Sequence, residues 1–350
     1  MSAPYAEPMD HREDKARPLS PPTIRDVAER AGVSKSLASL ALRGDPGVGE
    51  ARRASVRQAA EDLGYRPNRV ARALAETRSG TVGVLLNDLR NPWFVDLLAG
   101  LTAALDGGGL APVLADSFTA RRIGRSAVDQ LLAQRVDAIV VVGTTEDDGP
   151  LREAATSGCP VLLAGTYEPG DLGADVVVND DRHGAVLATR HLLDLGHRRT
   201  VHLTGPGEVG RLRAEGFRAT AEAAGVPAWT VPGGMSEESG YAAARRLLQD
   251  DARPGAVFAY NDLAAVGVLS AAHDLGLEVP RDVSVVGYDN THIAAIGPVS
   301  LTSVDNGTFA IGVQSGRFAI ERISGRSGGA RVHRVAATLE VRRTTGPAPR

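Results

Sequence analysis

The feature that most constrains the fold is an alternation of short apolar segments with helical ones, which begins at Thr81. After Asp180 the alternation starts again, and a last strand is predicted at Val335–Arg342. Continuously apolar strands that alternate with helices are typical of parallel sheets covered on both faces. Two successive sets therefore predict two α/β lobes. The apolar segments are 81–87, 111–116, 137–143, 160–165 and 174–180 in the first set, and 200–205, 256–262 and 283–290 in the second.

Several of these segments end in polar residues. The pairs are Asn87-Asp88, Asn261-Asp262 and Asp289-Asn290. Ligands of open parallel sheets bind beyond the carboxyl ends of the strands. One polar strand end is weak evidence because every strand must end, but pairs from both sets predict a ligand site at these ends.

A different pattern precedes the alternation. A helix begins after Thr23 and ends at Gly32, and Ser34 can cap a second helix that runs to about Leu42. A third helix is predicted over Glu50–Leu63. Short helices joined by a tight glycine turn have the outline of a helix-turn-helix, although another small three-helix bundle fits the pattern equally well.

The charge distribution supports a binder of polyanions. Residues 23–80 hold 11 Lys and Arg against 7 Asp and Glu, whereas residues 81–350 hold 25 against 31, and the whole chain has a net charge of −3. A basic module ahead of an acidic body fits a protein that binds nucleic acid, although a solvated charged surface would look similar. Residues 1–22 are rich in proline and charge and predict a disordered tail.

Other classes of protein find little support. The single cysteine, Cys159, excludes an intramolecular disulfide and the usual cysteine metal site. We see neither a signal peptide nor an apolar run long enough to span a membrane, and we expect a cytoplasmic protein. No catalytic set or metal-ligand cluster stands out, so we expect no enzymatic activity, no metal and no cofactor.

Two rival functions fit the sequence less well. Gly205–Gly210 fits the G-x-G-x-x-G pattern of a dinucleotide site, but it lies in the middle of the chain and no ribose-binding acid ends a strand about 20 residues later. A dehydrogenase is therefore disfavoured. An exported sugar-binding protein would need a signal peptide and would not need residues 23–75.

Six segments share a further pattern: 23–34, 63–74, 131–136, 191–197, 260–262 and 282–289. Together they resemble the lactose-repressor family, and the resemblance covers about residues 23–343. It implies a helix-turn-helix headpiece and a periplasmic-binding-protein-like core of two parallel-sheet lobes, working as a homodimer. The expected divisions are a tail (1–22), a headpiece (23–68), a hinge helix and linker (69–80), a core (81–343) and a flexible tail (344–350). Within the core we expect an N-lobe of 81–180 plus 308–335 and a C-lobe of 181–306 plus 336–343.

The resemblance also implies a set of DNA-binding residues. Lys35 and Ser36 would reach base edges, and Ser39 suits a phosphate oxygen. Leu40 can face DNA or pack inside, and Leu74 matches a hinge leucine that enters the minor groove, with packing between two hinge helices as the alternative. The full set is Thr23, Ser34, Lys35, Ser36, Ser39, Leu40, Asn68, Arg69, Arg72 and Leu74.

For the core, the resemblance implies an effector pocket. Trp93 and Phe94 would form an aromatic wall that suits the C–H face of a sugar or a base. The alternatives are that Trp93 fills the core, Arg213 forms a surface ion pair and Asp262 caps a helix. The expected effector residues are Asp88, Asn91, Trp93, Phe94, Arg213, Asn261, Asp262, Asp289 and Asn306.

Together these features predict a sequence-specific regulator of transcription, and the family resemblance implies repression. A small molecule, expected to be a sugar, would close the cleft between the lobes and so change the spacing of two headpieces on a roughly palindromic operator. No leucine heptads follow the last strand, so a dimer is expected rather than a tetramer.

Overall fold

The computed structural model describes residues 22–65, 78–143, 149–167, 172–250 and 252–349. The chain divides between Glu76 and Thr77 into two compact units. The hinge residues expected to contact DNA lie outside the described residues; they are Asn68, Arg69, Arg72 and Leu74.

The first unit is the headpiece and has the expected helices α1 (Ile24–Arg30), α2 (Lys35–Leu42) and α3 (Glu50–Asp62). Two local signals begin them. The Asp26 carboxylate accepts a hydrogen bond from the backbone N–H of Thr23 at 2.6 Å, and the Ser34 hydroxyl accepts one from the N–H of Leu37 at 3.2 Å. Between α1 and α2, Gly32 turns the chain at a φ of +66°, a conformation that favours glycine.

The helices of the headpiece enclose a small core. Val27 of α1 and Val56 of α3 are fully buried, as are Ala38 and Ala41 of α2. Because small residues face inward on α2, the helix packs closely and leaves its polar side outside. Leu40 is half buried: one side of it packs against this core, and part of its surface stays exposed.

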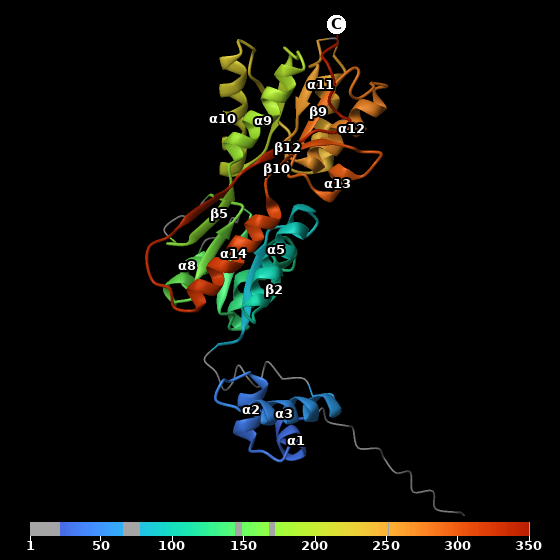
Figure 1. Ribbon diagram of the computed structural model, residues 1–350. Coiled ribbons are helices and arrows are strands. Elements are labelled where there is room, and N and C mark those ends of the chain that lie inside the picture. The colour runs from blue at the N-terminus through green and yellow to red at the C-terminus, as the bar shows by residue number, and fades with distance from the viewer. Residues whose placement is uncertain (1–21, 66–77, 144–148, 168–171, 251, 350) are drawn as a thin grey trace, which may run out of the picture. The chain divides into compact units, whose positions relative to one another are not determined.

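The second unit contains two lobes, each built on a six-stranded sheet (Figure 1). The N-lobe sheet has the order β11-β5-β4-β3-β1-β2, and its paired strands run parallel. Its strands are β1 (Thr81–Leu86), β2 (Ala111–Asp116), β3 (Ala138–Val142), β4 (Val161–Ala164), β5 (Asp175–Asn179) and β11 (Val332–Val335). Its helices are α5 (Trp93–Gly107), α6 (Ser117–Arg122), α7 (Ala127–Ala133), α8 (Gly149–Thr156) and α14 (Thr308–Ile323).

The C-lobe repeats this plan with the order β12-β10-β9-β8-β6-β7. Only β12 pairs antiparallel, with β10. The strands are β6 (Thr200–Thr204), β7 (Trp229–Pro232), β8 (Ala256–Phe258), β9 (Ser284–Tyr288), β10 (Thr302–Asp305) and β12 (Thr338–Glu340). The helices are α9 (Asp181–Asp194), α10 (Gly207–Ala223), α11 (Glu237–Leu248), α12 (Asp262–Asp274) and α13 (His292–Ala295).

Helices cover both faces of each sheet, as the continuously apolar strands predicted. In the N-lobe, α5 and α14 pack on one face through Leu97, Leu101 and Ile311, and α7 and α8 cover the other. In the C-lobe, α11 and α12 cover one face and α9 and α10 the other. These two three-layer lobes hold the carboxyl ends of their strands at fixed positions, which is where the polar residues lie.

Two expectations about the end of the chain differ from the structure. The predicted strand Val335–Arg342 is not one strand: Val335 is the last residue of β11, in the N-lobe sheet, and Thr338–Glu340 form β12, in the C-lobe sheet. Residues 344–349 were expected to be a flexible tail, but they pack on the C-lobe. Thr344 is buried, its hydroxyl donates to the carbonyl of Val285 at 2.7 Å, and the N–H of Ala348 donates to the carbonyl of Leu195.

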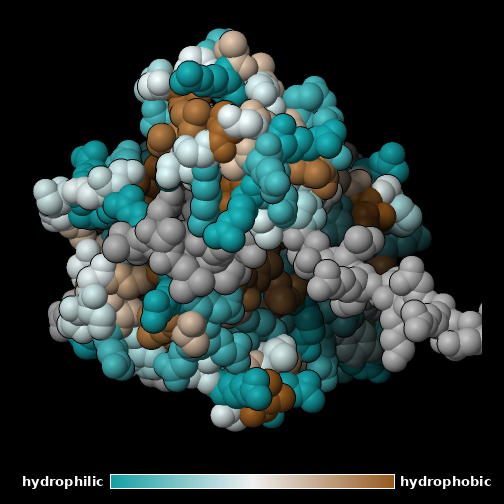
Figure 2. Space-filling view, turned by 90° about the horizontal axis from the view of Figure 1, so that it is seen from below, coloured by the Kyte–Doolittle hydropathy of each residue, from teal (hydrophilic) through white to brown (hydrophobic). Residues whose placement is uncertain are grey.

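None of the described helices is long and apolar enough to cross a membrane. In the space-filling view of Figure 2, hydrophilic residues cover most of the visible face and hydrophobic residues form small, separate patches. The large hydrophobic side chains of the described residues lie mainly within the cores already described.

Candidate functional site

The centre of the site is Arg213, which α10 carries into the interior of the C-lobe. The guanidinium is almost fully buried, and its Nε donates to Oδ1 of Asp181 at 2.8 Å. Its Nη1 donates to the carbonyl of Tyr260 at 2.6 Å. The guanidinium carbon also lies 3.5 Å from the ring centroid of Tyr288, a close cation–π contact. The alternative of a surface ion pair for Arg213 does not fit this environment.

Asp289 and Asn306 complete the cluster. Asp289 follows β9 and has a φ of +97°, a rare and costly conformation for a residue with a side chain. Its Oδ1 lies 3.6 Å from Nη2 of Arg213 and accepts a hydrogen bond from Nδ2 of Asn306 at 3.0 Å. Burial raises the pKa of Asp289 well above its ordinary value, although Arg213 opposes this shift. Among the described residues Oδ2 of Asp289 has no hydrogen-bond partner, so it can accept from a ligand hydroxyl.

Asp181 belongs to this cluster and was missed by sequence reasoning. It is the first residue of α9, it is buried, and it holds Arg213 by the shortest carboxylate contact of that guanidinium. Its Oδ2 is buried without a hydrogen-bond donor among the described residues. A signal existed, because the apolar segment before it ends in the polar residues Asn179 and Asp180.

Asn261 and Asp262 lie nearby, but their side chains support the protein. Asn261 caps α12 by accepting from the N–H of Ala264 at 2.9 Å, and its Nδ2 donates to the carbonyl of Met235. Asp262 accepts hydrogen bonds from the N–H of Thr291 at 2.7 Å and from the hydroxyl of Ser303 at 2.6 Å. Asp262 therefore does not cap α12, as the alternative held, because Asn261 does so; the Asp262 carboxylate instead accepts hydrogen bonds from Thr291 and Ser303.

On the N-lobe side, the expected residues do not form one cluster. Asp88 lines a cavity at the end of β1 and pairs with Arg90, whose Nη2 lies 2.6 Å from Oδ2. The Asn91 side chain accepts from the N–H of Trp93 and so begins α5. Trp93 and Phe94 are buried in the N-lobe core with their rings 5.3 Å apart, so Phe94 acts as core and Trp93 contributes mainly there. The indole Nε1 of Trp93 is buried without an acceptor among the described residues.

One side-chain hydrogen bond joins the two halves of the site. Nδ2 of Asn179, at the end of β5, donates to the hydroxyl of Tyr288, at the end of β9, at 2.9 Å. Tyr167 adds a hydroxyl contact to the carbonyl of Asn179. The carboxyl ends of β5 in the N-lobe and β9 in the C-lobe therefore meet here.

The headpiece presents a polar surface on α2. Lys35 and Ser36 are exposed at its first turn, and Ser39 is half exposed. The hydroxyls of Thr23 and Ser34 make local contacts at helix starts, at 2.8 Å to Asp26 and 3.2 Å to the N–H of Leu37. Lys35 makes no ion pair with any described residue, so its charge is available to a polyanion. Among the described residues we find no group of three His, Cys, Asp or Glu side chains that could hold a metal ion.

Comparisons with known proteins agree with this architecture. The family model "Bacterial regulatory proteins, lacI family" matches residues 23–68, and that of the periplasmic binding protein-like domain matches residues 189–345. The ribose operon repressor of Escherichia coli strain K12 is 34% identical over 289 residues, which are 81% of this chain and 87% of the relative. Two solved structures, each 29% identical, are similar. The lac repressor dimer bound to operator and the anti-inducer ONPF has a TM-score of 0.77, with 93% of this chain and all (100%) of that one covered. The transcriptional regulator CelR–cellobiose complex has a TM-score of 0.69, with 92% and 99% covered.

A helix-turn-helix unit joined to a two-lobed core with a polar cluster at its strand ends defines a ligand-responsive regulator of transcription. The family match and the 34% identical relative make the assignment specific. The chain belongs to the lacI family of bacterial regulatory proteins, whose members matched here are transcriptional regulators and not enzymes.

Proposed function

We propose that the protein is a repressor that binds a roughly palindromic operator as a homodimer, and that a sugar-like effector in the cleft controls its affinity for DNA. The observation that carries the proposal is the cluster of Arg213, Asp289 and Asn306 at the strand ends of the C-lobe. Two charged groups and an amide, buried together beside an unpartnered carboxylate oxygen, suit a ligand with several hydroxyl groups.

The DNA-binding part of the proposal rests on α2. Lys35 and Ser36 lie at the exposed start of this helix, which is the end that reaches base edges in a helix-turn-helix. Ser39, one turn later, suits a phosphate oxygen, and Leu40 retains enough exposure to touch a base. The lac repressor structure described above is a dimer bound to operator, which supports the same arrangement here.

A second copy of the chain would also cover exposed apolar side chains. Val95 of α5 is 58% exposed and Leu114 of β2 is 48% exposed, and these elements pack beside each other in the N-lobe. Large apolar side chains left in water favour association. If cleft closure changes the spacing of the two headpieces, effector binding is coupled to operator binding. The free energy of such a coupling is typically roughly 1–3 kcal/mol.

The test uses the full chain and duplexes from the regions that flank its own gene. Fluorescence anisotropy should show binding that weakens steeply with salt, because phosphate contacts release counterions. Ser36→Ala should weaken binding to the preferred duplex, whereas Ser55→Ala, an exposed serine of α3, should not. Sedimentation should show a dimer.

The effector is tested in the same assay with a panel of sugars and their acid and phosphate derivatives. At least one compound should change operator affinity, and Asp289→Ala should abolish that change. The proposal fails if no duplex is bound in a salt-dependent way, or if Asp289→Ala responds as the wild type does.

A further inference from the structure

The linker that leads from the headpiece joins the core at residues 78–80, beside the start of β3. The preceding part of the linker, residues 66–77, lies outside the described residues. Asp137, the residue before β3, holds the junction. Its Oδ1 accepts a hydrogen bond from the backbone N–H of Ser79, and its Oδ2 accepts one from the N–H of Gly80, both at 2.8 Å. One carboxylate therefore fixes two successive peptide groups of the linker.

Further contacts complete this linker clamp, which consists of Asp137, Ser79, Gly80 and Thr81. The N–H of Asp137 donates to the carbonyl of Thr81 at 2.8 Å, and the N–H of Ala111 donates to the carbonyl of Gly80 at 3.0 Å. The hydroxyls of Ser79 and Thr81 lie 2.7 Å apart. The end of the linker is thus tied to the starts of β2 and β3 at the point where β1 begins.

The backbone of Gly80 sets the direction in which the linker joins the core. Its φ is +70°, a conformation that favours glycine, and a Cβ atom at this position would meet no other atom within 4 Å. The backbone angle, rather than crowding, therefore calls for glycine here. Glycine is also the residue with the widest choice of backbone angles, so the hydrogen bond to Asp137 is what restricts it.

The carboxylate of Asp137 is directed at the linker. The residue is half buried and makes no ion pair with any residue that the structure describes. A carboxylate that is partly removed from water needs hydrogen-bond donors to replace its hydration. Here the N–H groups of Ser79 and Gly80 supply them. The charge of Asp137 therefore serves to hold the linker.

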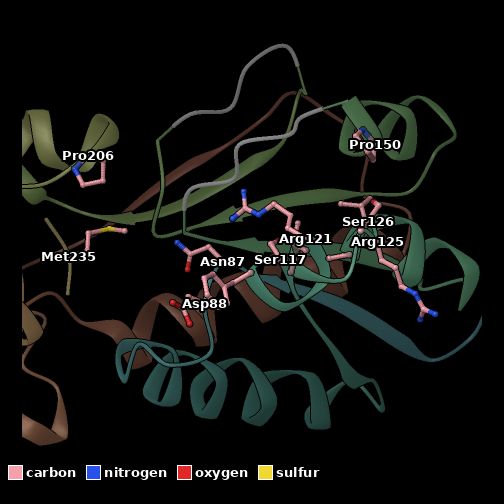
Figure 3. A pocket seen from close by; sticks show the side chains of 14 residues that line it. Asn87, Asp88, Ser117, Arg121, Arg125, Ser126, Pro150, Pro206 and Met235 are labelled. Atoms are coloured by element: carbon pink, nitrogen blue, oxygen red, sulfur yellow. The ribbon is translucent and has the colours of Figure 1, made fainter. Parts of the chain in front are cut away.

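Two central strands run from the linker clamp to the cleft. Val82–Leu86 of β1 pairs in parallel with the whole of β3, and the side chains of both segments are buried. At the other end of β1, Asn87 and Asp88 line the cavity of about 690 Å³ shown in Figure 3. Close-packed strands transmit a displacement instead of absorbing it. A movement of the N-lobe at the cleft would therefore carry the clamped end of the linker with it.

We propose that Asp137 is a positioning residue, and that the linker clamp sets which spacing of operator half-sites the dimer accepts. When one headpiece is bound, the effective concentration of the second at its half-site depends on the length and stiffness of the connection between them. Fixing the last residues of each linker shortens and stiffens that connection. The proposal rests on the proposed function, because it requires a dimer on a palindromic operator.

The experiment measures operator binding by the full-length protein as a function of half-site spacing. Duplexes are made from the preferred one by adding or removing one or two base pairs at the centre of its footprint, and another carries a single half-site. The wild type should bind each altered duplex at least about 10-fold more weakly than the preferred one, because a clamped linker cannot follow the change. The single half-site reports on the headpiece alone.

Two variants release the clamp by different chemistry. Asp137→Ala removes both acceptors, whereas Gly80→Ala places a side chain at a φ of +70° where no neighbour would clash with it. Each variant should discriminate less than about 3-fold between the spacings and should bind the single half-site as the wild type does. Asp106→Ala is the matched control. Asp106 is an exposed acid at the end of α5 and, among the described residues, makes no hydrogen bond with the linker.

Hydrogen exchange tests the clamp without DNA. The amide protons of Ser79 and Gly80 should be protected in the wild type, and they should exchange at least about 10-fold faster in Asp137→Ala. Protection that is the same in both proteins would overturn the proposal. If Asp137→Ala does not fold, Gly80→Ala still decides the question, because its substitution lies in open space.

The spacing series can also overturn the proposal. It fails if the wild type shows no preferred spacing, if Gly80→Ala and Asp137→Ala keep the preference of the wild type, or if Asp106→Ala loses it equally. An equal loss of affinity for the single half-site would place the effect in the headpiece and would also contradict it. In each of these cases salt-dependent operator binding, and with it the proposed function, can stand. If no duplex is bound, both proposals fail.

Discussion

The two lobes share a strand order, and each buries a cluster of acids and arginines, but the clusters lie at opposite ends of the strands. In the C-lobe, Arg213 meets Asp181 and Asp289 where the strands end, beside the cleft. In the N-lobe, Asp175 is the first residue of β5 and contacts Arg322 at 2.8 Å and Arg331 at 2.6 Å. The same chemistry therefore forms the proposed ligand site in one lobe and ties α14 and β11 to the sheet in the other.

The difference also appears in how the arginines meet water. The Arg213 side chain is 5% exposed, whereas those of Arg322 and Arg331 are 16% and 23% exposed. An arginine at the rim can be solvated when its partner is lost, and a fully buried one cannot. We therefore expect substitutions in the C-lobe cluster to cost more stability and to affect the effector response, and those in the N-lobe cluster to affect stability alone.

The largest effect is expected for Arg213→Ala. The substitution leaves Asp181 buried without its cation, and such a loss typically costs about 3–5 kcal/mol. Chemical denaturation should show a lower free energy of unfolding, and the effector should no longer change operator affinity. Arg211→Ala is the control on the same helix, because the exposed Arg211 pairs with Glu208 and Glu215 at the surface. Similar unfolding curves for the two variants would contradict the comparison.

The second effect is a pH dependence of the C-lobe. Burial raises the pKa of Asp262 to about 6, although hydrogen bonds from Ser303 and Thr291 hold it down. The ordinary value is 3.8, so between about pH 4 and pH 6 the folded protein binds more protons than the unfolded chain. The free energy of unfolding should therefore fall as pH rises through this window, by at most about 3 kcal/mol.

Asp262→Asn tests this pH dependence. The amide that replaces the carboxyl group cannot ionise, so the stability of the variant should change less between pH 4 and pH 6. The variant should also be less stable than the wild type at low pH, because the amide nitrogen cannot accept the hydrogen bonds that the carboxyl group accepts. Denaturation at several pH values measures the slope. An unchanged slope would exclude Asp262 as its source.

The third prediction concerns Asp175 in the N-lobe. Burial alone would raise the pKa of Asp175, but hydrogen bonds from Arg322 and Arg331 outweigh it and hold the pKa well below its ordinary value. A depressed folded pKa stabilises the protein above the unfolded pKa, and this contribution is lost as pH falls through the folded value. Asp175→Asn should therefore cost about 2 kcal/mol at neutral pH, reduced by the partial exposure of both arginines.

The effector response separates this variant from Arg213→Ala. The effector concentration that half-changes operator affinity should be the same in Asp175→Asn as in the wild type. A shifted midpoint would show that the N-lobe cluster takes part in ligand binding, and the contrast between the lobes would then be wrong.

Much of the fold could be predicted because local patterns and tertiary packing agree. The apolar segments became buried parallel strands, and the caps at Thr23 and Ser34 begin α1 and α2 as expected. The sequence also predicts a ligand site at the polar strand ends of both lobes. In the C-lobe, Asp289 at the end of β9 lies 3.6 Å from Arg213.

The roles of single side chains could not be predicted as well. Sequence spacing shows that Asn261 and Asp262 end a strand, but it does not show that their oxygens point to Ala264 and Thr291. These partners depend on how the loop after β9 returns over α12. Asp181 could have been found, because its strand also ends in polar residues, whereas its contact with Arg213 depends on the packing of α9 against α10.

The smallest effect is expected at the side-chain hydrogen bond that joins the lobes. Asn179→Ala leaves the Tyr288 hydroxyl without the donor that lies 2.9 Å away, and Tyr288→Phe removes the hydroxyl itself. A double-mutant cycle of these substitutions should give a coupling of about 1 kcal/mol in the free energy of unfolding, because each single variant already loses the whole bond. A coupling near zero would show that this hydrogen bond does not help to hold the lobes together. The proposed ligand site of the C-lobe and the structural cluster of the N-lobe would then have no energetic link through this pair of side chains.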